Sequence, residues 1–151
     1  MTSSEPSVTT AKSRFSMTCT VVVDVAAPPE RVWALLTDAD AQRRWNTTLT
    51  RIEGPIAVGK KVTLEVAAAP GRTFKPKVTA MDAPRTMVWS DGFAPMFRGQ
   101  RTFTLEAVGG GTRFTMSERF AGLMLPMIKK ALPDFAPIFA RYAADLARAA
   151  G

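Results

Sequence analysis

The stretch from Phe97 to Phe120, FRGQRTFTLEAVGGGTRFTMSERF, decides the fold, because it reads as two strands joined by a glycine turn. Apolar and polar residues alternate on both sides of the three glycines at 109–111. A period of two is typical of a strand with one buried face, and consecutive glycines suit a tight hairpin turn. The stretch therefore predicts an antiparallel hairpin with strands at 97–107 and 112–120.

Two charged residues of this hairpin fall on its apolar face. Arg101 alternates with aromatic and aliphatic residues in the first strand, and Glu118 lies between Met116 and Phe120 in the second. A two-residue turn at 109–110 places Arg101 opposite Glu118, and it also matches opposite charges on the outer face. The sequence therefore predicts an Arg101–Glu118 pair that points inward.

The rest of the chain adds further strands, two short helices and one long helix. Strands are expected at 14–25, 49–53, 61–66, 74–81 and 87–90, and short helices at 31–37 and 39–44. From Phe135 onward the apolar residues repeat at helical spacing, with Asp134 as the N-cap. Residues 1–13 are polar and are expected to form a disordered tail, which leaves residues 14–151 as a single domain.

This order of elements predicts an α+β fold with a seven-stranded, curved antiparallel sheet. The terminal helix is the only long amphipathic element, so it must cover the apolar face of the sheet. One helix is too narrow for the whole concave face of seven strands. The remaining space is either packed by large side chains or left open, and the fold is expected to enclose a cavity between the helix and the sheet.

Composition excludes several kinds of chemistry. The 151 residues include no histidine and a single cysteine, Cys19. Catalytic triads, cysteine–histidine dyads and histidine- or thiolate-ligated metals are excluded, and neither a metal nor another cofactor is expected. No stretch approaches the roughly 20 apolar residues of a membrane span, and no signal-peptide pattern is seen, so the sequence indicates a cytoplasmic protein.

The formal net charge of +7 raises the question of a nucleic-acid partner. The basic residues cluster at Lys60, Lys61, Arg72, Lys75 and Lys77. No exposed aromatic residue alternates with them to stack on bases. This cluster is interpreted as a solvated face, and no nucleic-acid partner is expected.

The residues with the right chemistry for a site are expected to face the cavity. The ligand-binding candidates are Trp45, Phe74, Trp89, Arg101, Phe103, Met116, Glu118, Phe120, Phe139 and Tyr142. The candidates for catalysis are Arg101, Glu118 and Asp91, the last of which is either an inward carboxylate or a turn residue. The Arg101–Glu118 pair is either a structural ion pair or a clamp in which the guanidinium orients a ligand's carbonyl or carboxylate.

The segment PPERVWALLTD at residues 28–38, followed by RWN at 44–46, resembles the opening of the START-like or SRPBCC superfamily. The stretch APRTMVW at 83–89, the glycine hairpin and the terminal helix are similar too. The resemblance covers about residues 15–150 and is closest to the polyketide cyclase/dehydrase-type branch. It implies the helix-grip fold of the pollen-allergen type, with a sheet wrapped on the terminal helix around a hydrophobic cavity.

The resemblance also implies a range of functions. Relatives bind lipids, sterols, polyketides or hormones, and some cyclise polyketide chains with a cavity arginine and aromatic hydroxyls as donors, which Arg101 and Tyr142 match in type. The leading hypothesis is binding of a small hydrophobic ligand of lipid, polyketide or aromatic type. The alternative is a polyketide cyclase or dehydratase, with Arg101 holding an enolate oxygen and Glu118 or Asp91 as the base. A third is a protein-interaction module resembling the heat-shock co-chaperone activators. The oligomeric state is left open.

Overall fold

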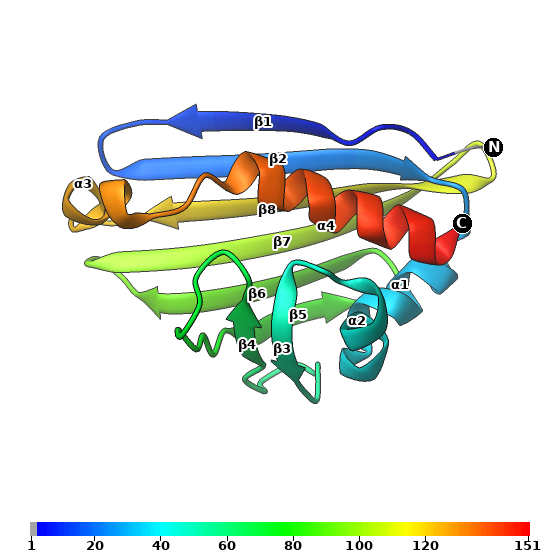
Figure 1. Ribbon diagram of the computed structural model, residues 1–151, viewed down its shortest axis with the longest axis horizontal. Coiled ribbons are helices and arrows are strands. Elements are labelled where there is room, and N and C mark those ends of the chain that lie inside the picture. The colour runs from blue at the N-terminus through cyan, green and yellow to red at the C-terminus, as the bar shows by residue number, and fades with distance from the viewer. Residues whose placement is uncertain (1–2) are drawn as a thin grey trace.

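A computed structural model describes residues 3–151 and has two layers, a curved antiparallel sheet and a layer of helices on one of its faces (Figure 1). The large sheet has six strands in the order β1-β2-β8-β7-β6-β5. Its strands are β1 (Ser7–Lys12), β2 (Ser16–Val25), β5 (Lys77–Asp82), β6 (Thr86–Phe93), β7 (Phe97–Val108) and β8 (Gly111–Ala121). A separate two-stranded sheet consists of β3 (Leu49–Glu53) and β4 (Thr63–Val66). The α+β, helix-grip architecture expected from the sequence is confirmed.

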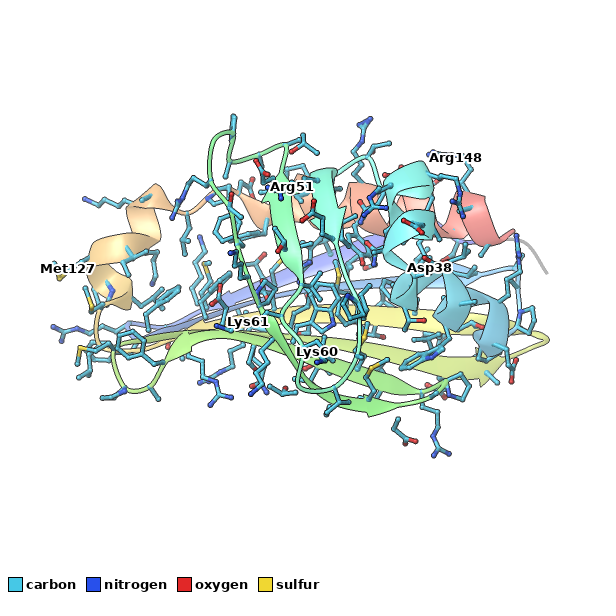
Figure 2. The ribbon with its side chains drawn as sticks, turned by 90° about the horizontal axis from the view of Figure 1, so that it is seen from below. Asp38, Arg51, Lys60, Lys61, Met127 and Arg148 are labelled. Atoms are coloured by element: carbon cyan, nitrogen blue, oxygen red, sulfur yellow. The ribbon has the colours of Figure 1, made fainter. Side chains whose placement is uncertain are left out.

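The helices lie on the same side of the large sheet as the β3–β4 hairpin, as the two views agree (Figure 2). They are α1 (Pro29–Thr37), α2 (Ala39–Trp45), α3 (Leu125–Ile128), the 3₁₀ turn η1 (Lys129–Ala131) and α4 (Phe135–Ala150). Among residues 3–151 no helix is both long and apolar enough to cross a membrane. The long helix α4 begins where expected, because the Asp134 carboxylate accepts a hydrogen bond from the amide of Ala136 at 3.2 Å.

The β7–β8 hairpin has the predicted register. Val108 pairs with Gly111 across a two-residue turn, and Arg101 pairs with Glu118. The turn residues Gly109 and Gly110 have φ values of 55° and 83°, the left-handed region that a two-residue hairpin turn requires and that glycine adopts without strain. The triple glycine thus fixes which side chains of these strands face α4.

The prediction of a disordered tail over residues 1–13 is wrong for residues 7–12, which form β1 at the edge of the sheet. β1 pairs with β2 along its whole length, from Ser7 opposite Val22 to Lys12 opposite Met17. Its side chains are mostly exposed, so the segment lacks the apolar alternation that marks a half-buried strand. Residues 1 and 2 of the expected tail lie outside the described residues.

The expectation of one seven-stranded sheet is also wrong, because the strands expected at 61–66 and 74–81 pair only at isolated positions. Lys61 pairs with Lys77 and Leu64 with Phe74, without a continuous ladder between them. Pro76 lies in this stretch and has no amide hydrogen to donate, although its carbonyl accepts from the amide of Val62 at 2.9 Å. The proline thus helps to separate the β3–β4 hairpin from the large sheet.

Large side chains fill the space beneath the middle of α4, where the sequence predicted a cavity. Tyr142 packs edge-on against Trp45 of α2 with ring centroids 5.4 Å apart, and it stacks on Phe114 of β8 at 6.3 Å. Phe103 of β7 lies between Tyr142 and Trp89 of β6, at 6.5 and 5.3 Å. These five side chains are all buried. The open volume is therefore found elsewhere along the helix.

Candidate functional site

A row of side chains crosses the sheet beneath the first half of α4. Backbone pairing places Thr10 of β1, Cys19 of β2, Glu118 of β8, Arg101 of β7 and Trp89 of β6 at successive positions. Directly paired residues of an antiparallel sheet share a face, and adjacent strands are about 4.8 Å apart. The row therefore lines up a hydroxyl, a thiol, a carboxylate, a guanidinium and an indole on the inner face.

The Arg101–Glu118 pair is the charged centre of this row. Arg101 Nη2 donates to Glu118 Oε1 at 3.2 Å, and the two side chains are 20% and 14% exposed. The guanidinium also lies over the ring of Phe139 in α4, 5.2 Å from its centroid. Ion pairing and a cation–π contact hold Arg101 in one orientation and leave several of its five N–H groups available as donors.

Trp89 adds an unusual donor next to this pair. Its indole Nε1 is buried and, within residues 3–151, has no hydrogen-bond partner. The indole of Trp45, by contrast, donates to the carbonyl of Leu35 at 3.0 Å. A buried N–H without a partner costs about 1–3 kcal/mol, and native proteins contain few such groups. The Trp89 N–H is therefore a donor that a bound molecule or a water would satisfy.

An open groove with a volume of about 510 Å³ lies at the Cys19 end of the row. One wall comes from the sheet edge and the other from the segment leading into α4. The lining residues are Thr10, Lys12, Met17, Cys19, Lys129, Leu132, Pro133, Asp134 and Phe135. Its volume is within the range of small-molecule sites, which is about 300–1,000 Å³. Because Glu118 pairs with Cys19, the ion pair begins one strand beyond the groove wall.

The pKa of Cys19, the only thiol of the chain, reflects the burial and the charges of this region. Burial raises the pKa of Cys19, and the negative charges of Asp134 and Glu118 add to the effect. The hydroxyl of Thr10, 3.9 Å from Sγ, and the positive charge of Arg101 act in the opposite direction. Cys19 is therefore a neutral thiol at pH 7, which suits an apolar groove wall and not a nucleophile.

Tyr142 belongs to the filled region. Burial raises the pKa of its hydroxyl far above the ordinary value, and the Arg101 charge and the Gln42 side chain offset this only in part. Its hydroxyl therefore stays protonated at all physiological pH values. It can act as a donor and not as a base.

The structure gathers most of the predicted candidates but not all of them. Phe103, Met116, Phe139, Tyr142, Trp45 and Trp89 are buried in one core cluster with α4. Phe120 stacks on Phe135 at 5.2 Å, next to the groove. Phe74 is only partly buried and lies under the Arg72 guanidinium, apart from the row. Asp91 lies in β6 opposite Gly99 and so is not a turn residue; it is exposed and accepts from the amide of Gly92 at 2.8 Å, so it is not a buried inward carboxylate either.

Sequence reasoning missed the outer wall of the groove. Thr10 and Lys12 were placed in a tail, and Lys129, Leu132 and Pro133 were not candidates. The motif at 132–135, Leu-Pro-Asp-Phe, does carry a signal, because a proline followed by a helix N-cap marks a bend that turns the chain over the sheet. Nothing in the sequence indicated that this bend meets β1.

The family follows from comparison with known proteins. Residues 16–150 match the family described as polyketide cyclase / dehydrase and lipid transport. The chain belongs to this family. The match covers β2 to α4, and so includes the ion pair and most of the groove lining.

Solved structures with the same fold are distant in sequence. A crystal structure of a Rhodobacter sphaeroides protein is 20% identical, with a TM-score of 0.72 over 95% of this chain and 96% of that one. A Mesorhizobium loti protein is 24% identical, with a TM-score of 0.65 over 86% and 95%. CalU16 from Micromonospora echinospora is 14% identical, with a TM-score of 0.57 over 96% and 95%. None of the curated proteins matches the chain. These likenesses establish the fold alone.

Proposed function

We propose that the protein binds one small hydrophobic molecule, of lipid, polyketide or aromatic type, in the groove between the β1–β2 edge and residues 129–135. The observation that carries the proposal is the position of this groove. About 510 Å³ of partly apolar space ends at Cys19, which pairs with Glu118, and Glu118 pairs in turn with the partly buried Arg101, two strands from the groove wall. Membership of a family described by lipid transport and polyketide chemistry supports the same conclusion.

The chemistry of the walls indicates how such a molecule is held. Met17, Leu132 and Phe135 offer apolar surface to its body. Beyond the inner end of the groove, two strands from Cys19, Arg101 offers N–H donors that are held in place by Glu118 and Phe139. This combination favours a ligand with an apolar body and one carbonyl or carboxyl oxygen.

Filling the groove tests the proposal. Leu132→Trp adds a large side chain at a partly exposed loop position, and Val58→Trp adds the same side chain at an exposed position elsewhere. We expect a dansyl-labelled fatty acid, titrated by fluorescence, to bind the wild type and Val58→Trp equally and Leu132→Trp at least about tenfold more weakly. Equal binding by all three proteins would contradict the groove as the site. Native mass spectrometry of freshly purified protein provides an independent search for a bound apolar compound.

The partly buried ion pair favours a second candidate, a polyketide cyclase or dehydratase. Glu118 lies next to the partly buried guanidinium of Arg101 and would act as the base while Arg101 holds an enolate oxygen. Turnover of a poly-β-ketone substrate that depends on pH and is lost in Glu118→Gln supports this function. Binding without turnover supports the first.

A further inference from the structure

Exposed apolar side chains gather at one end of the molecule, beside the groove. The large hydrophobic residues with high exposure are Phe15, Val58, Phe93, Leu123, Met124 and Met127, and all but Val58 lie in three adjoining turns. Met127 is 78% exposed, Phe93 72% and Leu123 57%. We call the turns at 12–15, 93–98 and 122–131 the apolar tip. Figure 2 labels Met127 at the extreme end of the long axis.

Hydrogen bonds between the three turns make the tip one surface. The amide of Gly122 donates to the carbonyl of Phe15 at 3.0 Å, and that of Leu123 donates to the carbonyl of Pro95 at 3.0 Å. Lys129 Nζ donates to the carbonyl of Ser13 at 2.8 Å. Gly122 has a φ of 143°, and a Cβ there would collide with the backbone of Met96. The turns are therefore closely packed.

The charges within the tip are of one sign. The three turns contain Lys12, Arg14, Arg98, Lys129 and Lys130 and no acidic residue. The nearest acidic residues along the chain, Asp91 and Asp134, lie just outside them. Lysine is depleted in protein–protein interfaces, whereas protruding apolar side chains ringed by lysine and arginine are typical of surfaces that bind anionic lipids.

The backbone of the tip is also compatible with a lipid interface. Peptide groups that enter the boundary of the hydrocarbon need internal hydrogen bonds, because water is scarce there. The amides from Gly122 to Leu125, and those of Met127 and Ile128, all donate to carbonyls of the protein. The apolar side chains of this segment can therefore leave water without exposing unpaired amides.

We propose that the apolar tip docks the protein on the surface of an anionic lipid bilayer. Leu123, Met127 and Phe93 enter the boundary between headgroups and acyl chains, and the basic residues contact the phosphates. Lys12 and Lys129 belong both to the tip and to the groove lining. Docking therefore brings the groove mouth to the lipid surface, and this last step rests on the proposed ligand site.

Vesicle binding tests the docking itself. The full chain is mixed with vesicles of phosphatidylglycerol and phosphatidylcholine, or of phosphatidylcholine alone, and bound protein is separated by flotation. We expect binding to the anionic vesicles that weakens with added salt, and much weaker binding to the neutral ones. Absence of binding to the anionic vesicles overturns the proposal.

Variants locate the surface. Leu123→Asp and Met127→Asp should each weaken vesicle binding about tenfold, and Arg14→Gln with Lys130→Gln should remove the preference for anionic vesicles. Val58→Asp is the matched control, because Val58 is 57% exposed, lies outside the tip and is close in sequence to Lys60 and Lys61, which Figure 2 labels well apart from Met127. Equal losses in Val58→Asp and Met127→Asp overturn the proposal.

Two further measurements separate the alternatives. If the wild type forms dimers in sedimentation, and Met127→Asp abolishes them without any effect on vesicles, the tip is a contact between copies and the proposal fails. Leu132→Trp, which fills the groove, should still bind anionic vesicles. Docking and ligand binding can thus fail independently of each other.

Discussion

Beneath the middle of α4, Tyr142 packs against Trp45 and Phe114, whereas beneath its first turn Phe135 borders an open groove. Both regions are rich in aromatic residues and lie under the same helix. They differ in what surrounds them, because α2 brings Trp45 to the middle of α4, while the groove at its start is lined only by residues of β1, β2 and the segment 129–135. In this protein, open space therefore lies at the start of α4, beyond the reach of α2, and not along the whole helix.

Truncating one aromatic residue in each region gives the largest expected contrast. Phe103→Ala removes a fully buried ring and should lower the free energy of unfolding by about 3–5 kcal/mol. Phe135→Ala removes a partly exposed ring at the groove wall and should cost only about 1–2 kcal/mol. Urea denaturation measures both values. Similar costs would mean that the two regions are equally well packed.

The ion pair lies between the two regions, and a double-mutant cycle defines its role. Removing one partner, as in Arg101→Met, should cost about 2–3 kcal/mol, which is less than the about 3–5 kcal/mol of a fully buried pair because these side chains keep some exposure. Arg101→Met combined with Glu118→Leu should recover most of this loss. Loss of fatty-acid binding in the stable double variant supports the ligand clamp. Unchanged fatty-acid binding in the double variant would mean that the ion pair has only a structural role.

High pH tests the filled region through Tyr142. Because burial raises its pKa in the folded state, the tyrosine of the unfolded chain loses its proton first, above about pH 10. Below that pH both states are protonated and stability is unaffected. At pH 11 this residue should lower the free energy of unfolding by about 1.4 kcal/mol. Tyr142→Phe should lack this decline, and an equal decline in both proteins would contradict the burial of the hydroxyl.

The smallest contrast compares two indoles. Trp45→Phe removes an N–H that bonds to Leu35, whereas Trp89→Phe removes one without a partner. Trp45→Phe should therefore cost about 1 kcal/mol more than Trp89→Phe, measured by thermal and urea unfolding. If Trp89→Phe is the more damaging change, its N–H has a partner such as a bound water in the free protein.

The sequence predicts a feature well when the residues that determine it are close together in the chain. The Arg101–Glu118 register follows from alternation and a glycine turn within a few residues, so it is local and was found. β1 lacks an apolar face, so its own residues do not indicate a strand. It forms a strand because the edge of β2, which follows it after a short turn, is available for pairing. The groove is harder still, because it forms where Lys12, Cys19 and Leu132 meet from three separate segments.

The positions of the chain ends have a practical consequence. Ser3 lies beside β2, where its hydroxyl accepts from the amide of Ala26 at 3.1 Å, and the ends of the described chain, Ser3 and Gly151, lie opposite the apolar tip (Figure 1). A tag, a fluorophore or a surface linker can therefore be fused at either end without covering the tip. Protein immobilised in this way would present the apolar tip to the solution. Its adhesion to a supported lipid film could then be measured directly, by force or by adsorption.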